Sequence, residues 1–426
     1  MENFSLLDYL KKNDPAKKER LDLLRYELEQ RVYYYGRHFK NPKEQTGGFF
    51  QTLRARLKYF FKNIYAFYLL SGAPRRTGAK TIISNAYFSV NERLSVAGLN
   101  VLQPLHNSCS RRTVGNLRIL KKFIALDRKI RVGDFNELLT DKFLKELDIF
   151  TDHLTDYYKS INVDALIVPN DIAFFEQLNI RIFKKLGKPS FVFLHGLPGR
   201  YNIYDENQTD YLIVWSEKIK QQYIKTGFNP AKILVSGHPF YENLPAGSLR
   251  YGLEDVLVIS KSLNGAPHRD GVRLTDRGGL IVYLDQIKDT LRVLGAKGAR
   301  LRVHPSEDIA WYLKFIDRDF FTADNEPLPD SLKKSSLVIG PTSTVFLEAI
   351  YYGVNYLIYE PTINGLDLTG YPPVPPFDGL DPKVPVAFNE ADLKRLLTEK
   401  NLVDKTIFND YIDTPFNIRG VIDLIK

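Results

Sequence analysis

The chain has 426 residues, of which 44% are hydrophobic and 26% are charged, and this balance excludes a largely disordered protein. Its length exceeds what one ordinary hydrophobic core supports, so we expect two domains of about 150 to 250 residues each. A net charge of +9 favours anionic partners, such as a nucleotide, an anionic lipid or nucleic acid, without choosing among them.

Residues 1–75 are predicted to form a helical N-terminal segment, because residues 15–36 carry apolar side chains at three- and four-residue spacing. Residues 54–70 interleave basic and aromatic side chains at helical spacing, which is typical of a membrane-surface helix and also of a core-facing helix with a solvated basic back. The most apolar run, residues 63–73, is shorter than the about 18 to 20 residues that span a bilayer. We therefore expect no membrane span.

From residue 80 onward the pattern changes to short strand-like runs that alternate with turns and helical stretches. In the first half these runs are residues 80–84, 100–104, 164–171, 190–196, 211–215 and 232–239. A helical stretch at residues 172–187 follows the third run. This alternation predicts parallel βαβ units.

The connection between the second and third runs is strongly basic. Residues 111–131 carry eight Lys or Arg against one Asp. Like residues 54–70, they are typical either of a membrane-surface helix or of a core-facing helix with a solvated basic face. Cys109 is the single cysteine, so no disulfide can form within the chain, and the sequence does not begin with a signal-peptide pattern. These features predict a cytoplasmic protein, either free or peripheral on the inner membrane.

The pattern pauses at residues 237–255, which are rich in Gly, Pro and polar residues, and then resumes. Strand-like runs follow at residues 255–262, 300–305, 335–343 and 355–361, with helical stretches at 278–295 and 344–353. We predict two α/β domains, residues 1–240 and residues 241–426. Ligands bind such sheets at the carboxyl ends of their strands, so we expect the chemistry there.

Two strand ends in the second half carry residues suited to a phosphate. His304 and Pro305 follow one strand, and a proline at the first helical position would start a helix whose N-terminus attracts anions. A turn histidine with a structural hydrogen bond is the alternative. Thr342, Ser343 and Thr344 follow the next strand, where hydroxyls and free N–H groups suit a phosphate, although ordinary N-capping would need one of the three.

These two motifs carry a resemblance to a known group of enzymes. The runs RVHP (302–305) and GPTSTVFLEA (340–349) are similar to the paired HP and Ser/Thr-Ser/Thr motifs of bacterial glycosyltransferases of surface-polysaccharide synthesis, notably the CMP-sialic acid and CMP-Kdo transferases. CDP-glycerol phosphotransferases have a related pair. The resemblance implies the GT-B fold, two Rossmann-like domains facing a cleft, with residues 1–240 on the acceptor side and residues 241–426 on the donor side. It also implies that His304, Ser343 and Thr344 hold the nucleotide and its phosphate.

The resemblance also implies a reaction, the transfer of Kdo or a sialic-acid-like sugar from a CMP-sugar to a lipopolysaccharide or capsule glycan. The expected partners are a nucleotide-sugar donor, a glycan or glycolipid acceptor and an anionic membrane surface, with no nucleic acid. Residues 317–319 imitate the Asp-x-Asp of metal-dependent glycosyltransferases but lie between a helix and a strand, so we expect no metal and no cofactor beyond the donor.

The catalytic residue is the least defined part of the prediction. Sialyltransferases take a catalytic aspartate from a paired acidic motif before glycine in the N-terminal domain. This chain has no convincing copy, and our first choice, Asp270, is a single acid before glycine in the other half. Asp171 follows a buried strand and suits either a general base or a helix N-cap, while His195 suits an acceptor contact or a turn. Lys261 and Ser262 end the first strand of the second half, where a cation could meet a phosphate.

Other functions stay open from the sequence. A glycerophosphotransferase, a UDP-sugar transferase or a nucleotide-sugar epimerase would use the same fold. A non-catalytic basic protein that binds nucleic acid or anionic lipid would explain the charge, but it would not explain two polar strand ends.

Overall fold

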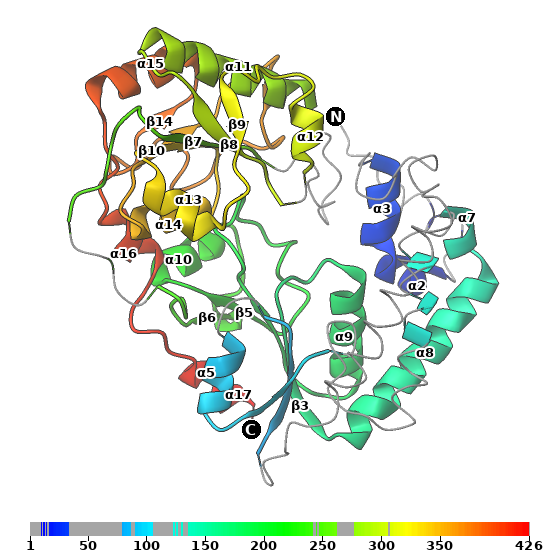
Figure 1. The fold of residues 1–426 in the computed structure, drawn as a ribbon. Coiled ribbons are helices and arrows are strands. Elements are labelled where there is room, and N and C mark those ends of the chain that lie inside the picture. Colours follow the sequence, from blue (N-terminus) through cyan, green and yellow to red (C-terminus); the bar gives the residue numbers. More distant parts are fainter. Residues whose placement is uncertain are drawn as a thin grey trace.

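Two parallel β-sheets form the centres of two α/β domains in the computed structural model (Figure 1). The structure describes residues 10, 12, 14, 17–33, 79–86, 90–104, 122, 123, 125, 126, 129, 130, 135–241, 244, 247–261, 277–305 and 307–425.

The first domain contains a six-stranded sheet with the order β2-β1-β3-β4-β5-β6, and all of its paired strands are parallel. Its strands are β1 (Thr81–Ser84), β2 (Asn100–Leu102), β3 (Val163–Val168), β4 (Ser190–Phe193), β5 (Tyr211–Val214) and β6 (Ile233–Val235). Most of their residues are buried, which suits a parallel sheet covered by helices on both faces. Each predicted strand-like run of the first half overlaps one of these strands.

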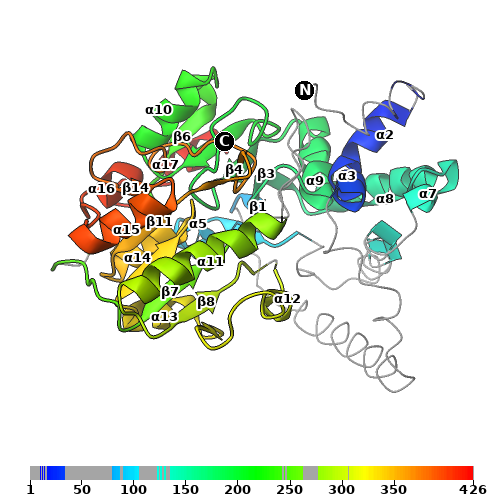
Figure 2. The same ribbon diagram turned by 90° about the horizontal axis from the view of Figure 1, so that it is seen from above.

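Helices of the first domain and of the N-terminal segment surround this sheet (Figures 1 and 2). One group is formed by α2 (Lys18–Leu23), α3 (Arg25–Tyr33), α7 (Phe135–Leu138), α8 (Asp141–Ser160) and α9 (Phe174–Lys185), and α5 (Val90–Val96) and α10 (Glu217–Lys225) lie apart from it. Arg181 of α9 pairs with Asp22 at 3.0 Å, and the Phe174 N–H donates to the Glu27 carboxylate at 3.2 Å. The described part of the N-terminal segment is therefore helical, as predicted, and is held against α9.

The second domain contains another six-stranded parallel sheet, with the order β14-β11-β10-β7-β8-β9. Its strands are β7 (Val256–Ile259), β8 (Ala299–Arg302), β9 (Phe321–Ala323), β10 (Leu337–Gly340), β11 (Tyr356–Tyr359) and β14 (Val386–Ala387). Numbered along the chain within this sheet, the order is the Rossmann order 3-2-1-4-5-6, which reverses direction between β7 and β10. A short antiparallel pair, β12 (Thr362–Ile363) and β13 (Leu366–Asp367), lies beyond β11.

Helices cover both faces of the second sheet. On the face away from the first domain lie α11 (Arg277–Val293) and α15 (Glu390–Glu399), which contact each other (Figure 1). On the opposite face lie α13 (Leu328–Lys334) and α14 (Val345–Tyr351), and the short α12 (Ile309–Tyr312) follows β8. Phe346 and Leu347 of α14 belong to the same buried apolar cluster as Trp215 of the first domain, so one hydrophobic core continues across the interface.

The end of the chain returns to the first domain. Helix α16 (Ile407–Tyr411) packs against α10, and α17 (Arg419–Leu424) follows it. The Asp413 N–H donates to the Trp215 carbonyl at 2.9 Å, and the Asn417 N–H donates to the Ser236 carbonyl at 2.7 Å. The expected division between residues 240 and 241 lies in the connection from β6 to β7, and it stays a prediction as a domain boundary.

These features confirm the predicted fold class, two Rossmann-like α/β domains in the GT-B arrangement with an additional helical N-terminal segment. Within the ranges described above, no helix combines the length and the hydrophobicity of a membrane span. The basic segment at residues 54–70 and most of residues 111–131 lie outside the described residues.

Candidate functional site

Four neighbouring strands of the second sheet end in polar residues on either side of the point where the strand order reverses. Lys261 follows β7, His304 follows β8, Thr342 to Thr344 follow β10, and Glu360 follows β11. Sheets of this type bind ligands at the carboxyl ends of the strands at this reversal. We call these residues (Lys261, His304, Thr342, Ser343, Thr344 and Glu360) the strand-end cluster.

Lys261 is the cation at the centre of this cluster. Its ammonium donates to the Thr342 carbonyl at 2.7 Å, and the Thr342 N–H donates to the Glu360 carboxylate. Desolvation lowers the pKa of Lys261, while the charge of Glu360 acts in the opposite direction. An ammonium has three donors, so a side chain bound to one carbonyl can still meet an anionic oxygen.

The side chain of Thr342 is buried, but its hydroxyl is not paired within the described residues. The residue is 6% exposed, and within the described part of the chain its Oγ1 has no hydrogen-bond partner. A buried hydroxyl left in this state costs about 1 to 3 kcal/mol. A ligand atom that bonded this oxygen would remove that cost.

The two following hydroxyls behave differently from Thr342. Ser343 Oγ accepts from the Val345 N–H at 3.2 Å, which is a local contact at the start of α14. Thr344 Oγ1 instead accepts from the Leu197 N–H of the first domain at 2.9 Å. Ordinary N-capping therefore accounts for only one of the three hydroxyls.

His304 is held at the end of β8 by its backbone. Its N–H donates to Ser260 Oγ at 3.1 Å, its carbonyl accepts from the Glu307 N–H at 2.8 Å, and its side chain is exposed. The expectation that a helix begins at Pro305 is wrong. Helix α12 begins at Ile309, because the Asp308 carboxylate accepts from the Ala310 N–H at 2.9 Å and caps it there.

His195 lies just beyond β4, two residues before Leu197, whose N–H donates to Thr344. Its Nδ1 is 3.0 Å from the Pro169 carbonyl oxygen. A carbonyl can only accept, so Nδ1 carries the proton and Nε2 of the neutral ring is an acceptor. The residue is exposed, and desolvation of its ring lowers the pKa of His195 against the raising effect of the Pro169 hydrogen bond.

Asp171 anchors a loop. Its Oδ2 accepts from the Gln208 N–H at 2.7 Å, and its Oδ1 accepts from the Glu206 N–H at 3.2 Å. The alternative N-cap role is not seen. The N-cap residue of α9 is Ala173, and its N–H donates to the side chain of Asn170 at 3.1 Å. Asp171 is 1% exposed, and both of its carboxylate oxygens hold the backbone of this loop, so these contacts favour an anchoring role.

Sequence reasoning missed Glu206, which lies in the loop that Asp171 anchors. Its backbone is in the left-handed region with φ 55°, uncommon for glutamate, and its carboxylate accepts from the Tyr223 hydroxyl at 2.7 Å. Burial raises the pKa of Glu206 to about 8. No local pattern signals this residue, because its surroundings come from distant parts of the chain. Glu360 was also missed, although the rule that selected His304 applies to it.

Two predicted site residues, Ser262 and Asp270, lie outside the described residues. Among the described residues, no group of His, Cys, Asp and Glu side chains is arranged to hold a metal ion.

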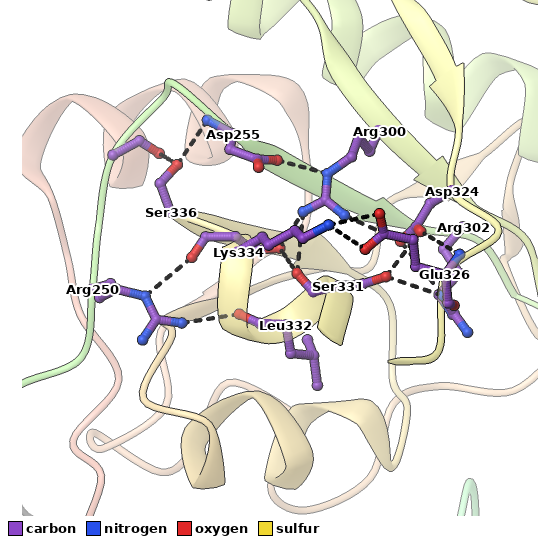
Figure 3. Close-up of polar contacts among 12 residues, drawn as sticks. Arg250, Asp255, Arg300, Arg302, Asp324, Glu326, Ser331, Leu332, Lys334 and Ser336 are labelled. Carbon is purple, nitrogen blue, oxygen red and sulfur yellow. Dashed lines mark hydrogen bonds and ion pairs between the residues drawn. The ribbon is translucent and has the colours of Figure 1, made fainter. Parts of the chain in front are cut away.

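The strand that carries His304 is braced by a network of arginines (Figure 3). Arg300 of β8 bonds Asp255 at 2.7 Å and Asp324 at 3.4 Å, and Asp324 also accepts from the Ser331 hydroxyl at 2.8 Å. Arg302 of the same strand donates to the Glu326 carbonyl at 2.7 Å. We call these residues (Asp255, Arg300, Arg302, Asp324, Glu326 and Ser331) the arginine network.

A pocket of about 850 Å³ lies elsewhere, between α2, α8 and α9. Both arginines of its lining are in ion pairs, Arg20 with Asp148 and Arg181 with Asp22, each at 3.0 Å. We therefore place the candidate chemistry at the strand-end cluster rather than in this pocket.

No protein-family model matches the chain, and no curated protein does. Among solved structures, the UDP-GlcNAc 2-epimerase of Neisseria meningitidis bound to UDP-GlcNAc is similar, with a TM-score of 0.43 and 13% identity, covering 81% of this chain and 98% of that one. MurG of Acinetobacter baumannii has a TM-score of 0.42 and 12% identity, covering 82% and 98%. The lipopolysaccharide outer core galactosyltransferase WaaB has 0.39 and 13%, covering 66% and 81%. Similarity of this size says nothing about the activity of this chain.

Proposed function

We propose that the chain is a metal-independent glycosyltransferase that transfers an acidic sugar, Kdo or a sialic-acid-like sugar, from a CMP-sugar to a lipopolysaccharide or capsule glycan. The observation that carries this proposal is the strand-end cluster, in which a cation and three hydroxyls gather at the reversal point of a Rossmann sheet. The motif resemblance supports the choice of CMP as the nucleotide.

The cluster suits a phosphate leaving group. When the bond between sugar and phosphate breaks, negative charge grows on the phosphate oxygens, and fixed donors aimed at them lower the barrier. Lys261 supplies a partly desolvated ammonium, and His304 and the hydroxyls of Thr342 and Thr344 supply further donors. A CMP-sugar places one phosphate here, which this set of donors can neutralise.

We assign activation of the acceptor to a residue of the first domain. A glycosyl acceptor needs a base for its hydroxyl proton, and in the neutral ring the Nε2 atom of His195 can accept one. Asp270 remains our candidate for a catalytic carboxylate, and the backbone bonds of Asp171 favour an anchoring role for that residue. Transfer assays of His195→Ala, Asp270→Ala and Asp171→Ala, each with CMP binding as the control for folding, separate these candidates.

The deciding experiment is a thermal-unfolding screen with CMP, CDP, UDP and GDP, because a ligand that binds only the folded state raises the unfolding temperature. We expect CMP to give the largest shift, and His304→Ala and Ser343→Ala to weaken CMP binding by about 1 to 3 kcal/mol. A preference for CDP would favour a glycerophosphotransferase, and a preference for UDP would favour a UDP-sugar transferase or epimerase. No shift with any nucleotide, with binding to DNA or vesicles, would favour the non-catalytic alternative.

The proposal places the enzyme in the cytoplasm, peripheral on a membrane that presents the acceptor. The basic residues 54–70 and 111–131 are the segments proposed to contact it. Binding to anionic vesicles should fall as salt rises, since about 0.1 M salt screens exposed charges beyond about 10 Å. Activity that survives EDTA would support metal independence.

A further inference from the structure

The loop after β4 reaches from the first domain into the strand-end cluster. The Leu197 N–H donates to Thr344 Oγ1 at 2.9 Å, across the interface between the domains. On one side the loop is held by the contact between His195 Nδ1 and the Pro169 carbonyl. Further along, the Tyr201 hydroxyl donates to the Pro375 carbonyl of the second domain at 3.4 Å. The loop is therefore fixed both before and after Leu197, the residue that contacts Thr344.

Gly196 leaves the space that this contact needs. A Cβ atom built on Gly196 would lie 2.7 Å from Thr344 Oγ1, which is closer than a carbon and an oxygen can approach without a shift. The φ angle of Gly196 is outside the left-handed region, so its backbone does not require glycine. The requirement at this position is one of space against the hydroxyl of Thr344.

The hydrogen bond from Leu197 fixes the direction of the Thr344 hydroxyl. A threonine hydroxyl has one proton and two lone pairs, and here one lone pair accepts from Leu197. Within the described residues the proton itself makes no hydrogen bond, so it stays available to an anionic oxygen. A hydroxyl that accepts one hydrogen bond is also a stronger donor for the next.

We propose that the Leu197 N–H, in the space left by Gly196, is a positioning group that aims the Thr344 hydroxyl at the phosphate of the donor. The nucleotide site of the second domain is then complete only when the first domain is docked against it. This inference rests on the proposed function, because it assigns a phosphate to the strand-end cluster.

The test compares two glycine variants by calorimetric titration with CMP. Gly196→Ala should weaken CMP binding at least about tenfold, because one lost hydrogen bond to a charged group has an effect of this size. Gly199→Ala in the same loop is the matched control, because a Cβ there meets no atom within 4 Å, and it should bind CMP within about twofold of wild type. Thermal unfolding confirms that both variants are folded.

Variants of Thr344 show whether the effect passes through its hydroxyl. Thr344→Ser keeps the hydroxyl and should bind CMP nearly as wild type does, whereas Thr344→Ala should lose as much affinity as Gly196→Ala. In the Thr344→Ala background, Gly196→Ala should have no further effect, because the two changes remove the same contact.

Three results would overturn the inference. The first is an unchanged CMP affinity in Gly196→Ala. The second is a Gly196→Ala substitution that lowers CMP affinity equally in the wild type and in Thr344→Ala. Either would show that Leu197 does not position the Thr344 hydroxyl, and the proposed function would stand. If the wild type bound none of CMP, CDP, UDP and GDP, the proposed function itself would fail, and this inference with it.

Discussion

Two sets of polar side chains in the second domain differ in how completely they are paired. In the arginine network, Asp324 is bonded by Arg300, by the Ser331 hydroxyl and by the Glu326 N–H (Figure 3). In the strand-end cluster, Thr342 Oγ1 is buried without a partner among the described residues, and Lys261 bonds a single carbonyl there. A fully paired set stabilises the fold by itself, whereas a partly paired set at strand ends is suited to a ligand that completes it.

The largest effect is expected from breaking the arginine network. Removing one partner of a buried ion pair costs about 3 to 5 kcal/mol, because the other charge is left uncompensated. The side chain of Asp324 is 1% exposed, so Asp324→Ala should lower the free energy of unfolding by that amount. Chemical denaturation measures it, and the folded variant should still bind CMP.

Lys334→Ala is the control for this prediction. Its ion pair with Glu326 is in the same region, but both side chains are about half exposed, and such pairs contribute about 1 kcal/mol or less. Equal losses in Asp324→Ala and Lys334→Ala would contradict a stabilising role for the buried part of the network.

The second largest effect is expected in the strand-end cluster, on binding rather than folding. Lys261→Met removes the ammonium and keeps a long apolar stem, so CMP affinity should fall by about 1.5 to 3 kcal/mol, roughly 10- to 150-fold. Any loss of folding stability should be smaller than in Asp324→Ala, because desolvation disfavours the charged form of Lys261 while the charge of Glu360 favours it. A matched Lys334→Met should leave CMP affinity unchanged. If Lys261→Met were strongly destabilised but bound CMP as tightly as the wild type, the comparison would be reversed.

Glu206 extends the comparison, because it is a partly buried carboxyl with a hydrogen bond but no ion pair among the described contacts. Burial raises its pKa to about 8 from near 4.5; Asp205 and Asp171 add to the rise, and Tyr223 and Arg200 oppose it. The folded state therefore holds a proton that the unfolded chain has released. The stabilising effect is fully present below about pH 4.5 and is lost as pH rises through about 8.

The expected slope is up to about 1.4 kcal/mol of unfolding free energy per pH unit between about pH 5 and 8. Glu206→Gln cannot ionise, so this part of the pH dependence should be absent from it. Denaturation of both proteins at several pH values tests the point, and parallel curves would show that Glu206 is ionised at neutral pH in the folded state.

The strands and their polar ends could be predicted from sequence because both are local signals. Buried parallel strands appear as short runs of Val, Ile, Leu and aromatic residues, and the residues that follow them fall at one edge of a sheet. Lys261 and the hydroxyls of residues 342–344 were found in this way. The start of α12 was placed wrongly because Pro305 and Asp308 are both helix-start signals, and local sequence does not decide between them.

The contacts that complete the site could not be predicted, because they join distant parts of the chain. The bond from Leu197 to Thr344 depends on how the two domains dock, and 147 residues separate its partners. The raised pKa of Glu206 depends on Tyr223 and on the anchoring of its loop by Asp171. Neither arrangement leaves a periodic or compositional signal.

The smallest effect, and the one with opposite signs for folding and binding, is expected from Thr342→Val. Valine has nearly the shape of threonine, and the backbone bonds of residue 342 to Lys261 and Glu360 are kept. Losing a buried hydroxyl without a partner should raise the free energy of unfolding by about 1 kcal/mol, while CMP affinity should fall. Thr290→Val on α11 is the matched control, because its Oγ1 is also buried without a partner in the described residues. It should stabilise the protein to a similar degree and leave CMP affinity unchanged. If both variants bind CMP as the wild type does, the unpaired hydroxyl of Thr342 is a packing feature and not a ligand contact.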